Sequence, residues 1–120
     1  MPQSDADTQP TISTHVLDTG SGRPAVAVPV ILSKLGDDGR PIRMTQALTD
    51  ADGRVRDLLE RPLSAGTYRL EFDLARGAGD AAEARFFRRV AVDVVVEDTT
   101  RSYHVPLLVA PYSVSSYRGS

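Results

Sequence analysis

Short stretches in which apolar and polar residues alternate run through most of this chain. The clearest is Thr67–Leu74, where apolar side chains occupy every second position and mostly charged side chains lie between them. Successive side chains of a strand point to opposite faces, so this period of two indicates strands with one buried face. The apolar face of the stretch carries Tyr68, Leu70, Phe72 and Leu74.

Turn residues separate seven or eight such stretches. The predicted strands are residues 11–18, 25–32, 42–48, a short one at Val55, 67–74, 88–97, 102–109 and 112–117. Pro29, inside the second of them, predicts an edge position or a bulge, because proline cannot donate to a strand ladder. One short helix is expected within residues 79–87, with Asp80 as its N-cap. Short strands at regular spacing predict an all-β fold, an antiparallel β-sandwich.

Size and composition limit the class of protein. The 120 residues fit a single domain, which we expect at residues 11–120 after a disordered polar leader at residues 1–10. The chain has no cysteine, so it forms no disulfide and offers no thiol nucleophile. A formal charge of -2 disfavours nucleic-acid binding. No apolar run approaches the ~18 residues of a membrane span, and the N-terminus lacks signal-peptide features, so a cytoplasmic protein is expected.

Three local patterns resemble ligand-binding motifs but have simpler explanations. The glycine-containing loop at residues 19–24 is followed by a strand, whereas a phosphate-binding loop needs a helix there. Asp50–Arg54 has part of a calcium-loop pattern, but the remaining ligands and the terminal Glu are missing, so turn formation explains it. The run Arg85–Arg89 is explained by arginine stems that cover apolar surface at the end of the helix. None of these stretches indicates a nucleotide, calcium or nucleic-acid site.

The two histidines are the main candidates for chemistry. His15 lies in the first predicted strand and His104 in the penultimate one, each beside apolar residues, where a lone histidine is more often structural than catalytic. Alternation puts one set of the later strand on a common face: Tyr103, Val105, Leu107 and Val109. If that set fills the core, His104 points outward, where a ligand or another subunit can reach it. Arg54 follows a glycine in a turn, where a solvated charge is the simplest interpretation.

Four blocks of sequence carry a resemblance to a known family. They are Thr14–Thr19 with Gly22–Ala25; Asp52–Arg54; Gly66–Asp73; and Tyr103–Leu108 with the Tyr-Arg-Gly-Ser ending at residues 117–120. On these blocks the chain, from about His15 onward, resembles the transthyretin-related family and, within it, the 5-hydroxyisourate hydrolases. The ending is the most specific block, because in this family it separates the hydrolases from the hormone carriers.

The resemblance implies both an assembly and a reaction. The implied assembly is a homotetramer of transthyretin-like sandwiches, a dimer of dimers, with sites in channels where dimers meet. The implied reaction is hydrolysis of the small molecule 5-hydroxyisourate to 2-oxo-4-hydroxy-4-carboxy-5-ureidoimidazoline in urate degradation, with neither a metal nor an organic cofactor. The implied catalytic residues are His15, Arg54, His104 and Ser120, and the implied substrate-binding residues are Tyr117, Arg118 and Gly119.

This sequence departs from the family pattern at three places. Ser102 stands where a histidine is often found, which affects a neighbouring hydrogen bond. Arg88 and Arg89 replace a Pro-Glu pair after two phenylalanines, and Val114 replaces an aromatic residue in the last strand. The second and third changes touch packing. None of the three removes a proposed catalytic group.

These groups suggest a mechanism. A neutral histidine with a pKa near ~6.5 can take a proton from water at physiological pH, and either His104 or His15 could do so while the other orients the substrate or delivers a proton. The planar guanidinium of Arg54 suits a flat ring and its developing oxyanion. The Ser120 hydroxyl and carboxylate would orient a histidine or the water. Two other functions remain open: a non-catalytic carrier of an aromatic small molecule on the same fold, and a structural sandwich used for protein contacts.

Overall fold

The computed structural model of this chain describes residues 9–77 and 85–119. Within these ranges the chain forms nine strands, so the all-β prediction is confirmed. The strands are β1 (Ile12–Asp18), β2 (Arg23–Pro24), β3 (Pro29–Leu35), β4 (Pro41–Leu48), β5 (Arg54–Val55), β6 (Gly66–Asp73), β7 (Arg89–Val96), β8 (Tyr103–Val109) and β9 (Val114–Ser116).

Two predicted segments lie partly outside the described ranges. Residues 1–8 of the predicted leader lie outside them, as do residues 79–84 of the predicted helical stretch. The described end of that helix, Arg85–Phe87, is not helical, and no described residue elsewhere is in a helix. The described part of the chain contains no helix long and apolar enough to cross a membrane.

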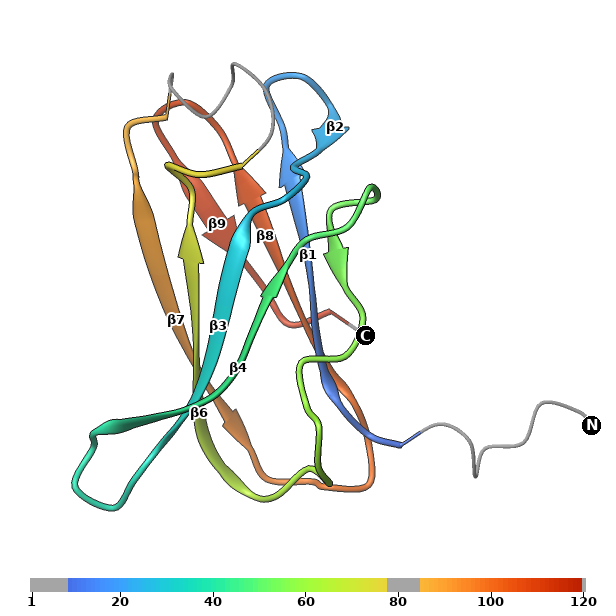
Figure 1. The fold of residues 1–120 in the computed structure, drawn as a ribbon, viewed down its shortest axis with the longest axis vertical. Helices are drawn as coiled ribbons and strands as arrows, with labels where there is room; N and C mark the ends of the chain where they lie inside the picture. Colours follow the sequence, from blue (N-terminus) through green and yellow to red (C-terminus); the bar gives the residue numbers. More distant parts are fainter. Residues whose placement is uncertain (1–8, 78–84, 120) are drawn as a thin grey trace, which may run out of the picture.

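The strands form two sheets that enclose a common core (Figure 1). One sheet has the order β2-β1-β8-β9, with β5 also paired to β1, and the other has the order β4-β3-β6-β7. The strand pairs are antiparallel except for β1 and β8, which run parallel and in register from Ile12↔Tyr103 to Asp18↔Val109. The first strand of the sandwich therefore lies directly beside the penultimate one.

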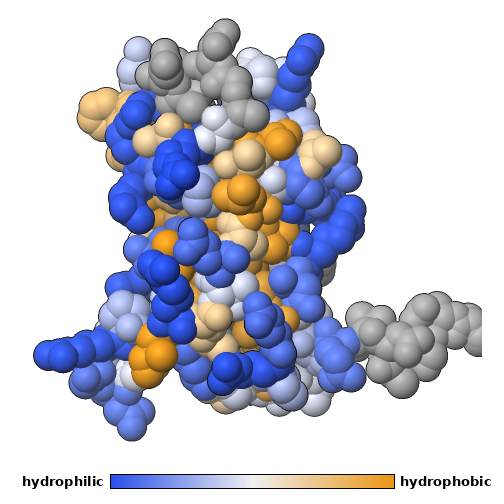
Figure 2. All heavy atoms as spheres, in the orientation of Figure 1, coloured by the Kyte–Doolittle hydropathy of each residue, from blue (hydrophilic) through white to orange (hydrophobic). Residues whose placement is uncertain are grey.

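The core is built from the apolar faces that alternation predicts. In β6, Tyr68, Leu70 and Phe72 are fully buried, and in β8 every second residue from Tyr103 to Val109 is buried. Burying one large apolar side chain fully contributes about 1.5–3 kcal/mol relative to leaving it exposed. On one side of the molecule, apolar residues also reach the surface in a column flanked by hydrophilic residues (Figure 2).

β3 differs from its prediction. Val26 and Ala27 form a turn, Ala27 with a φ of 61°, and the strand begins at Pro29 rather than at Ala25. Because β3 lies between β4 and β6, the prediction of an edge position for Pro29 is wrong. A proline at the first position of a strand is tolerated inside a sheet, since it need not donate to the ladder. An irregularity does occur in this strand, but between Leu32 and Ser33.

Candidate functional site

The outer face of the first sheet carries polar side chains near the start of β8. His104 lies on this face and is half-buried, whereas its neighbours Tyr103 and Val105 point into the core, as the alternation predicts. Because β1 and β8 are parallel and in register, Ser13 is the direct neighbour of His104 on β1. The Ser13 Oγ and the His104 Nδ1 lie 2.8 Å apart and form a hydrogen bond.

A tight turn before β5 sets the position of Arg54. The Asp50 Oδ1 accepts hydrogen bonds from the backbone N–H groups of Asp52 and Arg54, at 2.8 and 3.0 Å. These bonds, with that of Arg54 the larger cause, hold the pKa of Asp50 below its ordinary value. Gly53 has a φ of 76°, a backbone region that glycine enters without strain. Its carbonyl accepts a hydrogen bond from the Val16 N–H at 2.7 Å, which fastens the turn to β1.

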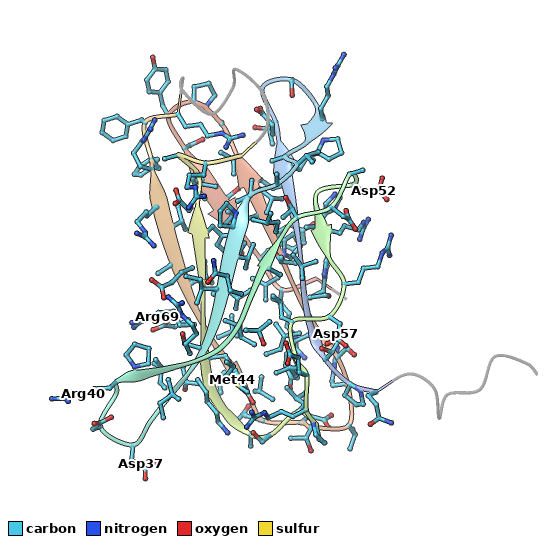
Figure 3. The ribbon with its side chains drawn as sticks, viewed as in Figure 1. Asp37, Arg40, Met44, Asp52, Asp57 and Arg69 are labelled. Carbon is cyan, nitrogen blue, oxygen red and sulfur yellow. The ribbon has the colours of Figure 1, made fainter. Side chains whose placement is uncertain are left out.

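The far end of the same segment is also attached to β1. β5 pairs with β1 so that Arg54 lies opposite His15. Beyond β5, the Asp57 carboxylate accepts a hydrogen bond from the hydroxyl of Thr11, the residue that precedes β1. Asp52 and Asp57, labelled in Figure 3, mark the two ends of this segment. Arg54 is therefore held between two attachment points, one at Val16 in β1 and one at Thr11 just before it.

An open pocket of about 130 Å³ lies where β1, β5 and β8 meet, and its lining residues are Ser13, Thr14, Arg54, Arg56 and His104. Two guanidinium groups give it positive charge, and together with the imidazole they supply several planar hydrogen-bonding groups. His15 shares the outer face of β1 with Ser13 but does not line the pocket. The pocket suits a flat ligand that carries carbonyl oxygens or negative charge.

The surroundings of His104 favour its neutral form. Burial is the largest cause that lowers the pKa of His104 below its ordinary value, and the positive charges of Arg54 and His15 lower it further. Burial and a like charge both disfavour the protonated imidazole. His104 therefore carries a free nitrogen lone pair at neutral pH, which is the state that a general base requires.

The end of the described chain returns to His104. The Gly119 N–H donates a hydrogen bond to the His104 carbonyl at 2.8 Å. Gly119 lies so close to the imidazole that a Cβ in its place would be 2.7 Å from the ring's Cδ2. The Arg118 guanidinium lies 5.0 Å from the centroid of the Tyr103 ring, and Tyr117 is exposed. Ser120 lies outside the described residues.

A second cavity of about 330 Å³ also includes His104. It lies between β7, β8 and the segment after β9, and its lining residues are Val92, Val94, Val95, Tyr103, His104, Val105, Ser116, Tyr117 and Arg118. His104 thus contributes to both cavities. Among the predicted site residues, Arg54 lines the polar pocket, while Tyr117 and Arg118 line the larger and more apolar cavity.

Three residues of the polar pocket, Ser13, Thr14 and Arg56, were not predicted from the sequence. Ser13 lies two positions before His15, so alternation alone puts both on one face of the strand. Its contact with His104 depends on the β1–β8 register, which no local pattern reveals. Arg56 likewise lies two residues after Arg54. In residues 9–77 and 85–119, no group of three or more His, Cys, Asp or Glu side chains is placed to hold a metal ion.

Comparison with known proteins identifies the family. The sequence model of the HIUase/Transthyretin family matches residues 12–119. This chain belongs to that family. A 5-hydroxyisourate hydrolase of Deinococcus radiodurans is 44% identical over 117 residues, which cover 92% of this chain and 97% of the relative.

Two solved structures of HIUase/transthyretin family members have the same fold. The Klebsiella pneumoniae 5-hydroxyisourate hydrolase aligns with a TM-score of 0.76 and 34% identity, covering 92% of this chain and 99% of that one. Sea bream transthyretin in complex with thyroxine aligns with a TM-score of 0.78 and 27% identity, covering 90% and 93%. The fold is therefore shared by a hydrolase and a thyroxine-binding protein, and the side chains of the site must distinguish the two functions.

Proposed function

We propose that this protein is a 5-hydroxyisourate hydrolase, which opens the ring of 5-hydroxyisourate with water to give 2-oxo-4-hydroxy-4-carboxy-5-ureidoimidazoline in urate degradation. One observation carries the proposal: His104 and Arg54 line a single polar pocket, in a chain that is 44% identical to a curated 5-hydroxyisourate hydrolase. A base and a fixed cation around one pocket are the groups that hydrolysis of a cyclic amide needs.

In the proposed mechanism His104 is the general base. Its imidazole takes a proton from water while the water oxygen attacks a ring carbonyl carbon. The resulting oxyanion collapses, the ring C–N bond breaks, and the nitrogen leaves with a proton returned by the imidazolium. A lowered pKa and a place in the pocket favour His104 over His15 for this role. General-base catalysis of this kind contributes roughly 10²–10⁴-fold.

The other predicted residues have supporting roles in this mechanism. The Arg54 guanidinium stabilises the oxyanion and the flat ring, since it is always charged and planar. His15 lies opposite Arg54 in the β1–β5 pairing and orients the substrate from that side. Tyr117, Arg118 and Gly119 form the substrate-binding segment beside His104, and Ser120 orients a histidine or the water.

We also propose a homotetramer, a dimer of dimers, with sites at the interface between dimers. Two features support it. The polar pocket opens on the outer face of a sheet, so a second subunit can close it against bulk water. The region of the β7 edge also exposes large apolar side chains, Phe86, Phe87 and Val95, and oligomerisation commonly covers such surfaces.

The test is the decay of 5-hydroxyisourate in the ultraviolet, generated from urate and followed with and without protein. We expect the wild-type protein to accelerate the decay. His104→Asn should lower turnover by at least about 100-fold at unchanged oligomeric size, whereas Arg40→Gln, an exposed change in the β3–β4 hairpin, should leave it unaltered. Decay at the uncatalysed rate with wild-type protein would contradict the function, and full activity of His104→Asn would contradict the assignment of the base.

A carrier function is the alternative, because the thyroxine-bound transthyretin shares this fold. A carrier would bind an aromatic ligand such as thyroxine and return it unchanged. Equilibrium binding of thyroxine, combined with no effect on 5-hydroxyisourate, would favour the carrier.

A further inference from the structure

Ser13 makes the one side-chain hydrogen bond to the imidazole of His104 that the described residues provide. Its Oγ lies 2.8 Å from Nδ1, and the two residues are direct partners in the β1–β8 pairing. Seven consecutive register pairs hold these strands together, so the contact is set by two rigid elements rather than by a loop. A side chain positioned in this way can determine how a catalytic ring is oriented.

The opposite side of the ring is held by backbone. Gly119 lies against Cδ2, where there is no room for even one methyl group, and its N–H is hydrogen bonded to the His104 carbonyl. Ser13 on the Nδ1 side and Gly119 on the Cδ2 side leave the outer edge of the ring, with Nε2, as the part that substrate can reach. Within the described residues Nε2 has no hydrogen-bond partner.

The charges around the pocket select between the two tautomers of neutral His104. A serine hydroxyl can donate to Nδ1 or accept from it, and the choice decides whether Nε2 carries a proton or a lone pair. Arg54 and Arg56 line the same pocket as the ring. Arg56 is paired with the Asp52 carboxylate at 3.7 Å, so Arg54 is the cation that acts most directly on the ring. Its positive charge disfavours an N–H directed toward it and favours a lone pair there. The Nδ1–H form, with Ser13 as acceptor, is therefore favoured.

We infer that Ser13 is a positioning residue, which accepts the hydrogen bond from the Nδ1–H of His104 and keeps the Nε2 lone pair directed into the pocket. The inference rests on the proposed hydrolase, in which Nε2 is the atom that takes the proton from water. Because a hydroxyl is uncharged, Ser13 fixes the ring and its tautomer while raising the basicity of the imidazole less than a charged partner would. It thus differs from a carboxylate partner, which would stabilise the imidazolium.

A matched pair of variants tests the role of the hydroxyl. Ser13→Thr and Ser13→Val introduce β-branched side chains of nearly the same shape, and only threonine has an oxygen that can accept from Nδ1. We expect Ser13→Thr to retain most of the activity. We expect Ser13→Val to lower kcat about tenfold with little change in KM, the size of effect that corresponds to one lost hydrogen bond.

A tautomer measurement supplies a readout that a merely structural role would not move. Nitrogen chemical shifts of His104 should report Nδ1–H in the wild type and in Ser13→Thr, and a mixture or the Nε2–H form in Ser13→Val. Assignment uses His15→Gln, which leaves a single histidine in the chain.

The outcomes separate this inference from the proposed function. If the wild type hydrolyses 5-hydroxyisourate and Ser13→Val has the wild-type kcat and the wild-type tautomer, the role of Ser13 is refuted while the function stands. If the wild type is inactive, the hydrolase proposal fails, and the nitrogen shifts still decide whether Ser13 sets the tautomer. If Ser13→Val unfolds, Ser13→Ala takes its place with the same expected loss.

Discussion

The imidazole of His104 is the point at which burial, charge and hydrogen bonding act on a single side chain. Burial and the neighbouring cations lower its pKa, while Ser13 and Gly119 restrict its orientation. The first effect keeps the ring unprotonated, and the second determines which nitrogen is available. Both are needed, because a correctly oriented ring that is protonated cannot accept a proton.

A pH titration of His104 tests the electrostatic part of this description. We expect a pKa below the ordinary histidine value of about 6.5, so kcat/KM should fall only when the pH drops through that lower value. Removing the positive charge in Arg54→Gln should raise the pKa toward 6.5, because a nearby cation disfavours the imidazolium. Proton NMR of the His104 ring measures both values without requiring activity. A titration at or above 6.5 in the wild type would contradict the proposed environment.

At the scale of elements, the two-residue strand β5 determines where Arg54 lies in the candidate site. It holds Arg54 on the sheet that carries His104, and the turn that precedes it depends on Gly53. A Cβ at Gly53 would lie 2.5 Å from the Val16 carbonyl oxygen and 2.9 Å from the Pro24 Cβ. This glycine is therefore required by space as well as by its positive φ.

Two alanine substitutions separate these requirements. Gly53→Ala should lower the free energy of unfolding by roughly 3 kcal/mol or more, since backbone strain and overpacking add. Gly39→Ala, in the β3–β4 turn, has a similar φ of 80° but no atom within 4 Å of the added Cβ, so a loss of only about 1 kcal/mol is expected. Urea denaturation of both variants at one protein concentration gives the comparison. Equal losses of unfolding free energy in the two variants would mean that Gly53→Ala avoids the close contact with the Val16 carbonyl without an energetic cost.

Local patterns predict the elements of this sandwich better than their arrangement. Alternation correctly gives β6 and the buried face of β8, because each pattern reports on its own strand. The edge position predicted from Pro29 was wrong, because the missing N–H of proline is tolerated at the first residue of a strand as well as in an edge strand. The neighbourhood of Ser13 and His104 could not be predicted at all, because it depends on a parallel pairing between strands 91 residues apart. His15 and His104 were candidates as the two histidines of the chain, and alternation predicted the outward direction of His104, whereas the catalytic role of Arg54 came from the family resemblance.

At the scale of the whole molecule, a buried ion pair joins the two sheets. The Arg85 Nη2 lies 3.6 Å from Asp18 Oδ2 at the end of β1, and both side chains are largely buried. The same guanidinium donates through Nη1 to the carbonyl of Leu74, directly after β6 in the other sheet. The Asp18 Oδ1 meanwhile accepts from the backbone of Gly20 and Ser21. Arg85 therefore connects the end of one sheet to the end of the other.

Breaking this pair should be costly. Arg85→Met leaves a buried carboxylate without its cation, and we expect a loss of roughly 3–5 kcal/mol in unfolding free energy. Asp18→Asn should also destabilise, and the double variant should lose less than the sum, since neither charge then remains unpaired. Arg69→Met is the control: its pair with Asp93 has a good bidentate geometry but is exposed, so about 1 kcal/mol or less is expected. Additive losses at Asp18 and Arg85 would show that the two groups act independently.

The parallel contact between β1 and β8 also determines when activity can arise as the protein is made. Synthesis delivers the N-terminal part first, so Ser13, His15 and Arg54 leave the ribosome well before His104 does. Until residue 104 has emerged, β1 lacks its parallel neighbour and the chain lacks His104, the proposed general base. Translation products that end before residue 104 should therefore be inactive, however well their strands pair. Catalytic activity should be among the last properties that a nascent chain acquires.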